Sequence, residues 1–279
     1  MNEFRADLHC HTTCSDGTLT PKEIIHLAKK NGLSGLSITD HDTVEAYDEA
    51  ISEARAADLA LISGVEFSAN HANTSVHILG YAFVFDGVRD LCNRHKKRRE
   101  DRNRTILSLL AANGMPLTEE EVLACTTIPL HGLTRIVGRP HIAQAMIKKG
   151  YIDSVQNAFK LYIGEGKPCY APGESFSVDE TIDVIHGAKG YAIIAHPHLI
   201  NNESLIPKLL SMEFDGIEGY YAQLQSQKHE RWIKIAKKKE WLITGGSDFH
   251  GTIKPNPLGC SWVGEETFRR LEDRYKENT

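Results

Sequence analysis

Short apolar runs alternate with amphipathic stretches over the first third of the chain. The runs at residues 4–8, 35–39, 59–65 and 76–81 have the length and apolar content of strands. Helical patterns separate the first three runs, and a capping box at Thr20 and a second start signal at Asp42 mark where those helices begin. This alternation predicts parallel strand pairing with right-handed crossovers.

A long run of helical patterns interrupts this alternation from about residue 89. Helices are predicted over residues 90–113, from Thr118 onward, over 140–149 and over 154–163. Further strands are then predicted over residues 191–195, 216–220 and 241–244. The pattern predicts an α/β protein in three parts: a first barrel part at residues 1–88, a helical insertion domain at 89–176 and a second barrel part at 177–279.

Composition excludes several other classes of protein. The 279 residues are 41% hydrophobic and 25% charged, which is typical of a globular protein and excludes general disorder. No apolar run of about 18 residues predicts a membrane helix, and the first residues lack a secretory signal pattern. The six cysteines form no CxxC pair, so neither a zinc knuckle nor a disulfide framework is expected. We therefore expect a cytoplasmic protein.

Histidines and carboxylates gather at the ends of the predicted strands. His9 and His11 follow the first strand, and Asp248 and His250 follow the last; alternate residues of an extended chain point to the same side. Because the carboxyl ends of parallel strands meet on one face of a barrel, these side chains should converge. Unpaired buried imidazoles and carboxylates would be costly, which disfavours a purely structural role. Imidazole and carboxylate groups without thiolates suit zinc, manganese or iron.

The motifs around these residues identify a family resemblance. They are His9-Cys10-His11-Thr12-Thr13-Cys14-Ser15-Asp16-Gly17, Ile38-Thr39-Asp40-His41-Asp42, Gly64-Val65-Glu66-Phe67-Ser68, Val76-His77-Ile78-Leu79-Gly80-Tyr81, Ala195-His196-Pro197 and Gly246-Ser247-Asp248-Phe249-His250. In this order they resemble the PHP (polymerase and histidinol phosphatase) superfamily of phosphoesterases. The insertion, with Gly138-Arg139-Pro140-His141-Ile142-Ala143, is similar to the branch of 3′,5′-nucleoside bisphosphate phosphatases, some of which are 5′-to-3′ exoribonucleases on short RNA.

The resemblance implies a fold and a ligand set. The fold would be a distorted, TIM-like (β/α) barrel of seven strands that holds three divalent ions, usually manganese, with iron or zinc as alternatives. The implied ligands are His9, His11, Asp16, His41, Glu66, His77, His196, Asp248 and His250, with Glu66 bridging two ions. Asp40 lies within the second motif and is either a ligand or a residue that orients one.

Positive charge in the insertion predicts a second phosphate site. Residues 94–104 contain seven Lys or Arg and two acids, although such a run is as often a solvated helix face. Arginines three or four residues apart share one face of a helix, and a guanidinium group binds phosphate through two parallel hydrogen bonds. The helix predicted to begin at Pro140 would also offer N–H groups to an anion. The substrate-binding candidates are Arg99 (or Arg98), Arg102, Arg135 and Arg139.

These features predict a phosphoric ester hydrolase. Closely spaced divalent ions generate hydroxide at neutral pH and neutralise phosphoryl oxygens, so no side-chain nucleophile is needed. The expected reaction is removal of the 3′-phosphate from a nucleoside 3′,5′-bisphosphate or trimming of short RNA from its 5′ end, without a membrane or a stable protein partner. The alternatives are a histidinol phosphatase of the same superfamily, a metallo-amidohydrolase, and a metal-holding binding domain that lost catalysis.

Overall fold

The computed structural model describes residues 3–126, 136–200, 202–222 and 226–278. The strands are β1 (Ala6–Asp7), β2 (Gly35–Ser37), β3 (Ala60–Ile62), β4 (Gly64–His71), β5 (Thr74–Tyr81), β6 (Tyr191–Ile194), β7 (Gly216–Tyr221) and β8 (Leu242–Gly246). The α-helices are α1 (Pro21–Lys30), α2 (Tyr47–Ala56), α3 (Phe85–Ala112), α4 (Glu119–Leu123), α5 (Arg139–Lys148), α6 (Val155–Ala158), α7 (Val178–Gly187), α8 (Ile206–Leu209), α9 (Ser226–Lys239) and α10 (Glu265–Asn278). Shorter helical turns are the π-helix η1 (Phe159–Ile163) and the 3₁₀ helices η2 (Pro197–Leu199) and η3 (Glu203–Leu205).

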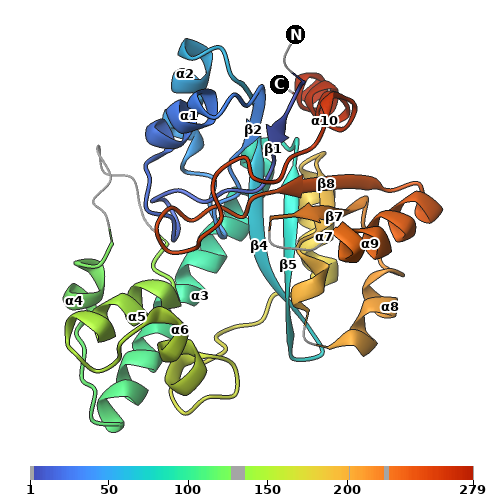
Figure 1. Ribbon diagram of the computed structural model, residues 1–279. Helices are drawn as coiled ribbons and strands as arrows, with labels where there is room; N and C mark the ends of the chain where they lie inside the picture. The colour runs from blue at the N-terminus through green and yellow to red at the C-terminus, as the bar shows by residue number, and fades with distance from the viewer. Residues whose placement is uncertain (1–2, 127–135, 201, 223–225, 279) are drawn as a thin grey trace.

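The strands form two hydrogen-bonded sheets. The first has the order β1-β2-β3 with parallel pairs, and the second has the order β4-β5-β6-β7-β8 (Figure 1). Parallel bridges connect the two sheets, one between Cys10 and Phe249 and one between His41 and Glu66. The segment that follows β2 is therefore brought next to Glu66 of β4, and the segments that follow β1 and β8 lie side by side.

Pairing in the second sheet is mixed, which corrects the expectation of parallel pairing throughout. β5 is antiparallel to both β4 and β6, whereas β6, β7 and β8 are parallel to one another. A two-residue turn joins β4 to β5, and its residues Ala72 and Asn73 have φ values of 48° and 62°, as in a type I′ hairpin. In this register His77 of β5 pairs with Ser68 of β4, which places His77 at the same edge of the sheet as Glu66.

Local signals place most helix starts correctly. The capping boxes predicted at Thr20 and Thr118 are both present. The helix start predicted at Asp42 is wrong, because α2 begins at Tyr47. Asp42 instead has a φ of 57°, and its carboxylate accepts the backbone N–H of Ser68 at 2.7 Å. A contact with a distant strand thus occupies the side chain that would otherwise cap the helix.

Helix α3 contributes to two separate apolar clusters. Its first half adds Val88 and Leu91 to the large cluster around the strands. Its second half adds Ile106 and Leu110 to a cluster whose members all lie within residues 106–171. In Figure 1, α4, α5 and α6 lie with the end of α3 in a lobe at the lower left, away from the strands. The arginine-rich middle of α3 lies between the two clusters.

The helices of the described segments are all too short or too polar to cross a lipid bilayer.

Candidate metal centre and anion pocket

Nine imidazole and carboxylate side chains from six segments of the chain meet near Glu66 of β4. They form four overlapping groups, in each of which the candidate ligand atoms lie within 4.8 Å of one another. The groups are His11-Asp16-His41-His250, His9-Glu66-His196, His9-His11-Asp248 and His41-Glu66-His77. These are the nine residues that the family resemblance implies as ligands, so the structure brings the complete set together.

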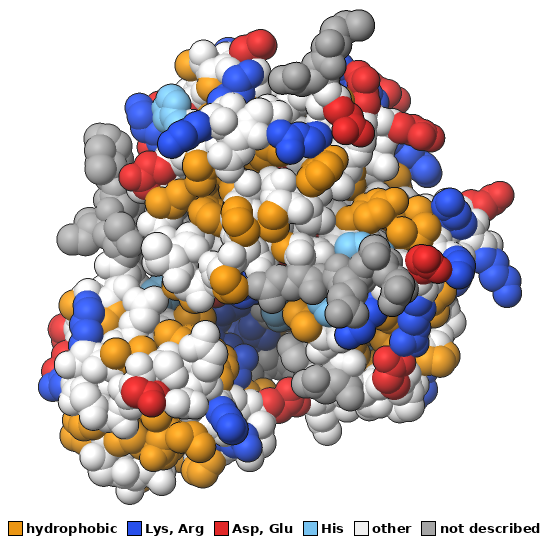
Figure 2. Space-filling model, in the orientation of Figure 1, with side chains coloured by type: hydrophobic (Ala, Val, Ile, Leu, Met, Phe, Trp, Pro, Cys, Tyr) orange, Lys and Arg blue, Asp and Glu red, His pale blue; other side chains and the backbone are white. Residues whose placement is uncertain are grey.

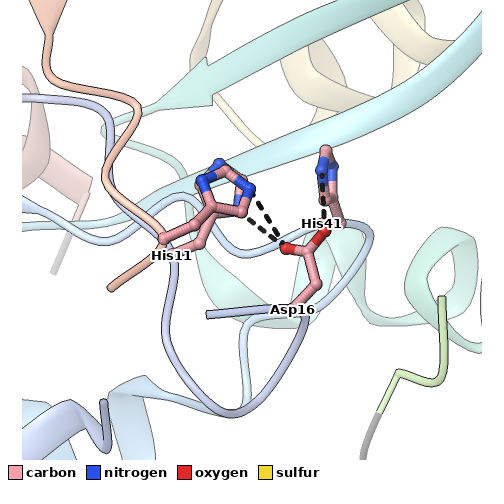
Figure 3. A group of neighbouring side chains, drawn as sticks. His11, Asp16 and His41 are labelled. Atoms are coloured by element: carbon pink, nitrogen blue, oxygen red, sulfur yellow. Dashed lines mark ion pairs between the residues drawn. The ribbon is translucent and has the colours of Figure 1, made fainter. Parts of the chain in front are cut away.

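Asp16 lies among three histidines, two of which, His11 and His41, are labelled beside it in Figure 3. Its Oδ1 lies 3.7 Å from Nδ1 of His11 and 3.3 Å from Nε2 of His250, and its Oδ2 lies 3.8 Å from Nε2 of His41. A tight turn at Gly17 folds this segment back on itself. A Cβ on Gly17 would lie 2.2 Å from the carbonyl oxygen of His11, so only glycine allows this approach.

Glu66 is surrounded by imidazoles that its two oxygens share. Oε2 lies at 3.5, 3.3 and 3.1 Å, respectively, from Nε2 of His9, Nε2 of His11 and Nδ1 of His41. Oε1 lies 2.8 Å from both Nδ1 of His77 and Nε2 of His196. Burial by itself would raise the pKa of Glu66, but the surrounding imidazoles, His41 above all, hold it well below its usual range. The ionised carboxylate thus presents each oxygen to a different group of candidate ligands, as a bridging ligand does.

The two oxygens of Asp248 also face different partners. Oδ1 lies 3.4 Å from Nε2 of His9 and 3.3 Å from Nε2 of His11. Oδ2 accepts hydrogen bonds from the Tyr221 hydroxyl at 2.6 Å and from Nζ of Lys254 at 2.5 Å. The backbone of Asp248 has a φ of 49°, which few residues other than glycine adopt. One oxygen therefore faces the candidate ligands while the other is held by the protein.

Two buried carboxylates that the sequence analysis does not single out hold His9 in place. Glu218 of β7 accepts a hydrogen bond from Nδ1 of His9 at 2.8 Å and another from the backbone N–H of His196 at 2.7 Å. Asp7 accepts the backbone N–H groups of His9 and Ser247 at 3.1 and 3.0 Å. A carboxylate on Nδ1 leaves Nε2 of His9 available to a metal. The sequence does contain a signal for both residues, since each is an acid within a predicted strand.

Asp40 stands apart from the four groups found among the described residues. It accepts hydrogen bonds from the backbone N–H and the hydroxyl of Thr12 at 2.7 and 2.6 Å, and from the hydroxyl of Ser15 at 2.5 Å. These bonds hold the segment between His11 and Asp16. Of the two roles expected for Asp40, the geometry favours the one in which it orients ligands.

The donor set of this cluster fits divalent metal ions. Nε2 of His9, both ring nitrogens of His11 and Nδ1 of His41 are buried and lack a hydrogen-bond partner in the described part of the chain. Burial alone would raise the pKa of Asp16, but the charges of His250 and His41 hold it well below its usual range. Ions between ionised carboxylates and unpartnered nitrogens would satisfy both, and such ligands suit manganese, iron or zinc.

A cavity of about 460 Å³ opens beside the cluster. Its wall includes the candidate ligands Asp16, His41, His77 and His250, together with Arg98, Arg99, Arg102 and Arg139. Figure 2 shows basic side chains at the floor of the hollow between the two lobes, with histidine beside them. Three of the four predicted substrate-binding arginines therefore line this cavity, whereas Arg135 lies outside the described residues. Phe159 lines the cavity as well. The π-helix η1 begins at this residue, whereas the sequence predicts a single helix over residues 154–163.

The protein balances only part of this positive charge. Arg99 donates from Nε to Oδ2 of Asp42 at 2.7 Å, and Nη2 of Arg98 lies 3.6 Å from the same oxygen. Arg139 donates to a backbone carbonyl of η1 at 3.2 Å. Arg102 is only 8% exposed, and its Nε and Nη2 have no hydrogen-bond partner among the described residues. Burial, aided by the charges of Arg99 and Arg139, lowers the pKa of Arg102 well below its usual value, so an anion in the cavity would stabilise its charged form.

Comparison with known proteins decides the family. The sequence model of the PHP domain family matches residues 7–166 of this chain, which include six of the nine candidate ligands. The chain belongs to the PHP family. It is accordingly a metal-dependent phosphoesterase, a hydrolase of phosphoric esters.

Relatives of this PHP protein are similar over most of their length. A 5′-3′ exoribonuclease of Haemophilus influenzae is 33% identical over 266 residues, which cover 92% of this chain and 91% of the relative. A 3′,5′-nucleoside bisphosphate phosphatase of Chromobacterium violaceum is 27% identical over 255 residues, covering 88% and 86% of the two chains. A crystal structure from Bifidobacterium adolescentis, assigned as a metal-dependent phosphoesterase, is 31% identical and superposes with a TM-score of 0.87 over 96% of both chains.

Proposed function

We propose that this PHP enzyme removes the 3′-phosphate from nucleoside 3′,5′-bisphosphates and trims short RNA from its 5′ end. The observation that carries the proposal is the shared cavity, in which candidate metal ligands and incompletely neutralised arginines face the same space. A substrate with two phosphates on one nucleoside would match these two kinds of group. One of the two relatives described above is named as a 5′-3′ exoribonuclease and the other as a 3′,5′-nucleoside bisphosphate phosphatase. These names agree with the two reactions that we propose.

The nine clustered residues would hold three divalent ions, with manganese the preferred metal. Bound ions would activate water and neutralise charge on the phosphoryl oxygens. The side chains of this chain contribute in two ways. The carboxylates of Asp16, Glu66 and Asp248 are ionised and would bind the ions, and Glu218 fixes the ring orientation of His9. No side-chain nucleophile takes part, and the hydroxyl of Ser15 is already bonded to Asp40.

The arginines would hold the phosphate that is not cleaved. Arg99 is oriented by Asp42, whereas Arg102 has unused donors that a phosphate oxygen would satisfy. Arg139 would complete the site from α5, and Arg135 is proposed on its sequence position alone. A monophosphate such as histidinol phosphate, which carries an ammonium group in place of a second anion, would leave these donors unused and place like charges together. The arginines therefore disfavour histidinol phosphate as the substrate.

The proposal assigns different functions to two parts of the fold. We interpret the two sheets as parts of one distorted barrel that carries the metal centre, and residues 89–176 as a helical insertion domain that carries the arginines. The bridges that link the sheets at Cys10 and His41 support the first part. The apolar cluster confined to residues 106–171 supports the second.

A panel of phosphate esters tests the function directly. With manganese present, kcat/KM should be highest for adenosine 3′,5′-bisphosphate and should fall for adenosine 3′-monophosphate, which lacks the second phosphate. A short oligoribonucleotide should be shortened faster with a 5′-phosphate than with a 5′-hydroxyl. Equal rates on the bisphosphate and the monophosphate, or a preference for histidinol phosphate, would overturn the proposal.

A further inference from the structure

A lysine enters the same cavity from the loop that follows β8. Lys254 lines the cavity together with Asp16, His41 and His250. Its ammonium group donates to Oδ2 of Asp248 at 2.5 Å. Neither the sequence motifs nor the positions implied by the family resemblance include this residue, although it is hydrogen-bonded to one of the candidate ligands.

The loop holds this lysine in a defined position. The side-chain amide of Asn256, which is buried, donates to the carbonyl of Ser247 at 2.8 Å. The backbone N–H of Thr252 donates to the hydroxyl of Thr18 at 3.1 Å. Both ends of the short segment that carries Lys254 are therefore tied to neighbouring structure, which limits the entropy lost when its side chain binds a ligand.

The ammonium group has donors to spare. A lysine side chain is charged at neutral pH, and here its ammonium group lies against the Asp248 carboxylate. An ammonium has three N–H donors, and the hydrogen bond to Asp248 uses one of them. The side chain is 38% exposed, so the remaining donors are accessible to a ligand.

We propose that Lys254 is a catalytic residue that donates a hydrogen bond to an oxygen of the phosphoryl group being cleaved. The assignment follows from its partner: Lys254 is bonded to a candidate metal ligand, whereas Arg99 and Arg98 contact Asp42, which lies outside the ligand set. A fixed positive charge next to the reacting phosphoryl group stabilises the charge that develops in the transition state. The proposal rests on phosphoester cleavage at the histidine cluster, but not on the identity of the nucleotide.

A purely positioning role for Lys254 is the competing explanation. In that case the lysine would only orient Asp248 toward the ions. Tyr221 offers a matched control, because its hydroxyl donates to the same Oδ2 at 2.6 Å. Removing either donor weakens the hold on Asp248, but only the lysine has a charge and further donors for a phosphoryl oxygen.

The test compares Lys254→Met, Lys254→Arg and Tyr221→Phe in the manganese-loaded enzyme. Lys254→Met should lower kcat/KM about ten- to a hundredfold for both p-nitrophenyl phosphate and adenosine 3′,5′-bisphosphate, because both contain the phosphoryl group that is cleaved. The inhibition constant of inorganic phosphate should rise by a similar factor, and the manganese bound per chain should stay that of the wild type. Lys254→Arg keeps the charge and should retain part of the activity.

Two results would overturn this role. One is an unchanged inhibition constant for phosphate in Lys254→Met. The other is that Lys254→Met loses as much bound manganese as Tyr221→Phe does and that excess metal fully restores its activity. This result would show that the lysine only orients Asp248. Failure of the proposed function would look different: the wild type would show no preference for the bisphosphate, while the effect of Lys254→Met on p-nitrophenyl phosphate would still be measurable.

Discussion

Replacing Arg102 with methionine should make the protein more stable and a poorer enzyme at the same time. The Arg102 side chain is only 8% exposed, and two of its nitrogens lack a hydrogen-bond partner among the described residues. Arg98, Arg99 and Arg139 line the same cavity, so like charges surround it. Methionine has a similar length and no charge, and it would remove both penalties.

The structure sets the size of both effects. A buried donor left without a partner costs about 1–3 kcal/mol, so Arg102→Met should raise the free energy of unfolding by up to that amount. A charge-assisted hydrogen bond to a phosphate is worth about 1.5–3 kcal/mol, so kcat/KM for a bisphosphate should fall about ten- to a hundredfold. Activity on p-nitrophenyl phosphate, which has no second phosphate, should stay near the wild-type value because the candidate metal ligands are untouched.

The assay pairs urea unfolding with steady-state kinetics on the two substrates. Arg104→Met is the matched control: Arg104 lies on the same helix but is exposed and pairs with Asp101 and Glu119 at 3.2 Å, so its loss should change neither quantity much. Added sulfate should stabilise the wild type more than Arg102→Met, since the variant lacks the two unpartnered nitrogens of Arg102.

Two outcomes would refute this reasoning. If Arg102→Met destabilises the protein, then Arg102 has partners that stabilise the fold, and its donors are not free to bind an anion. If both substrates lose activity equally, Arg102 acts on the cleaved phosphoryl group or on the metal centre.

Three further predictions concern the metal centre. His9→Ala or Asp248→Ala should lower bound manganese and abolish turnover with an unchanged circular dichroism spectrum; full activity in metal-depleted His9→Ala would contradict the mechanism. Glu218→Gln should weaken manganese binding about 10–100-fold in a metal titration, because the amide is a poorer acceptor for Nδ1 of His9; an unchanged affinity would remove Glu218 from the site. Activity should rise toward mildly alkaline pH, because water beside a divalent ion loses its proton near or above neutrality, and an optimum at about pH 5 would point to a side-chain nucleophile.

The convergence of the candidate ligands that follow parallel strands is predictable, because it depends on strand direction. His9, His11 and His41 follow parallel strands, and residues that follow parallel strands meet at one edge of a sheet. Periodicity predicts a strand around His77, but it does not predict the direction of that strand. Antiparallel pairing of β4 and β5 depends on the turn at Ala72 and Asn73, a dipeptide without the glycine that usually marks such a hairpin.

The roles of residues that depend on distant partners are not predictable from the sequence. An acid before a helical pattern is a common cap, so the sequence predicts a helix start at Asp42, but its carboxylate accepts hydrogen bonds from Ser68 and Arg99, which are far away in the chain. Glu218 is marked only as an acid within a predicted strand and Lys254 is not marked at all, because their contacts with His9 and Asp248 form only in the folded protein. Sequence patterns locate ligands on strands, whereas these supporting contacts depend on how separate elements pack.

The position of α3 across two apolar clusters has an evolutionary consequence. One end of the helix is anchored among the strands and the other end is buried within residues 106–171, while the arginines lie between them. Mutations in the outer cluster can tilt or reshape the arginine-bearing wall without repacking the strands that hold the histidines. Selection could thus change which phosphate ester fits while the hydrolytic centre stays constant, and a lineage could acquire new substrates by drift in a part of the chain that performs no chemistry.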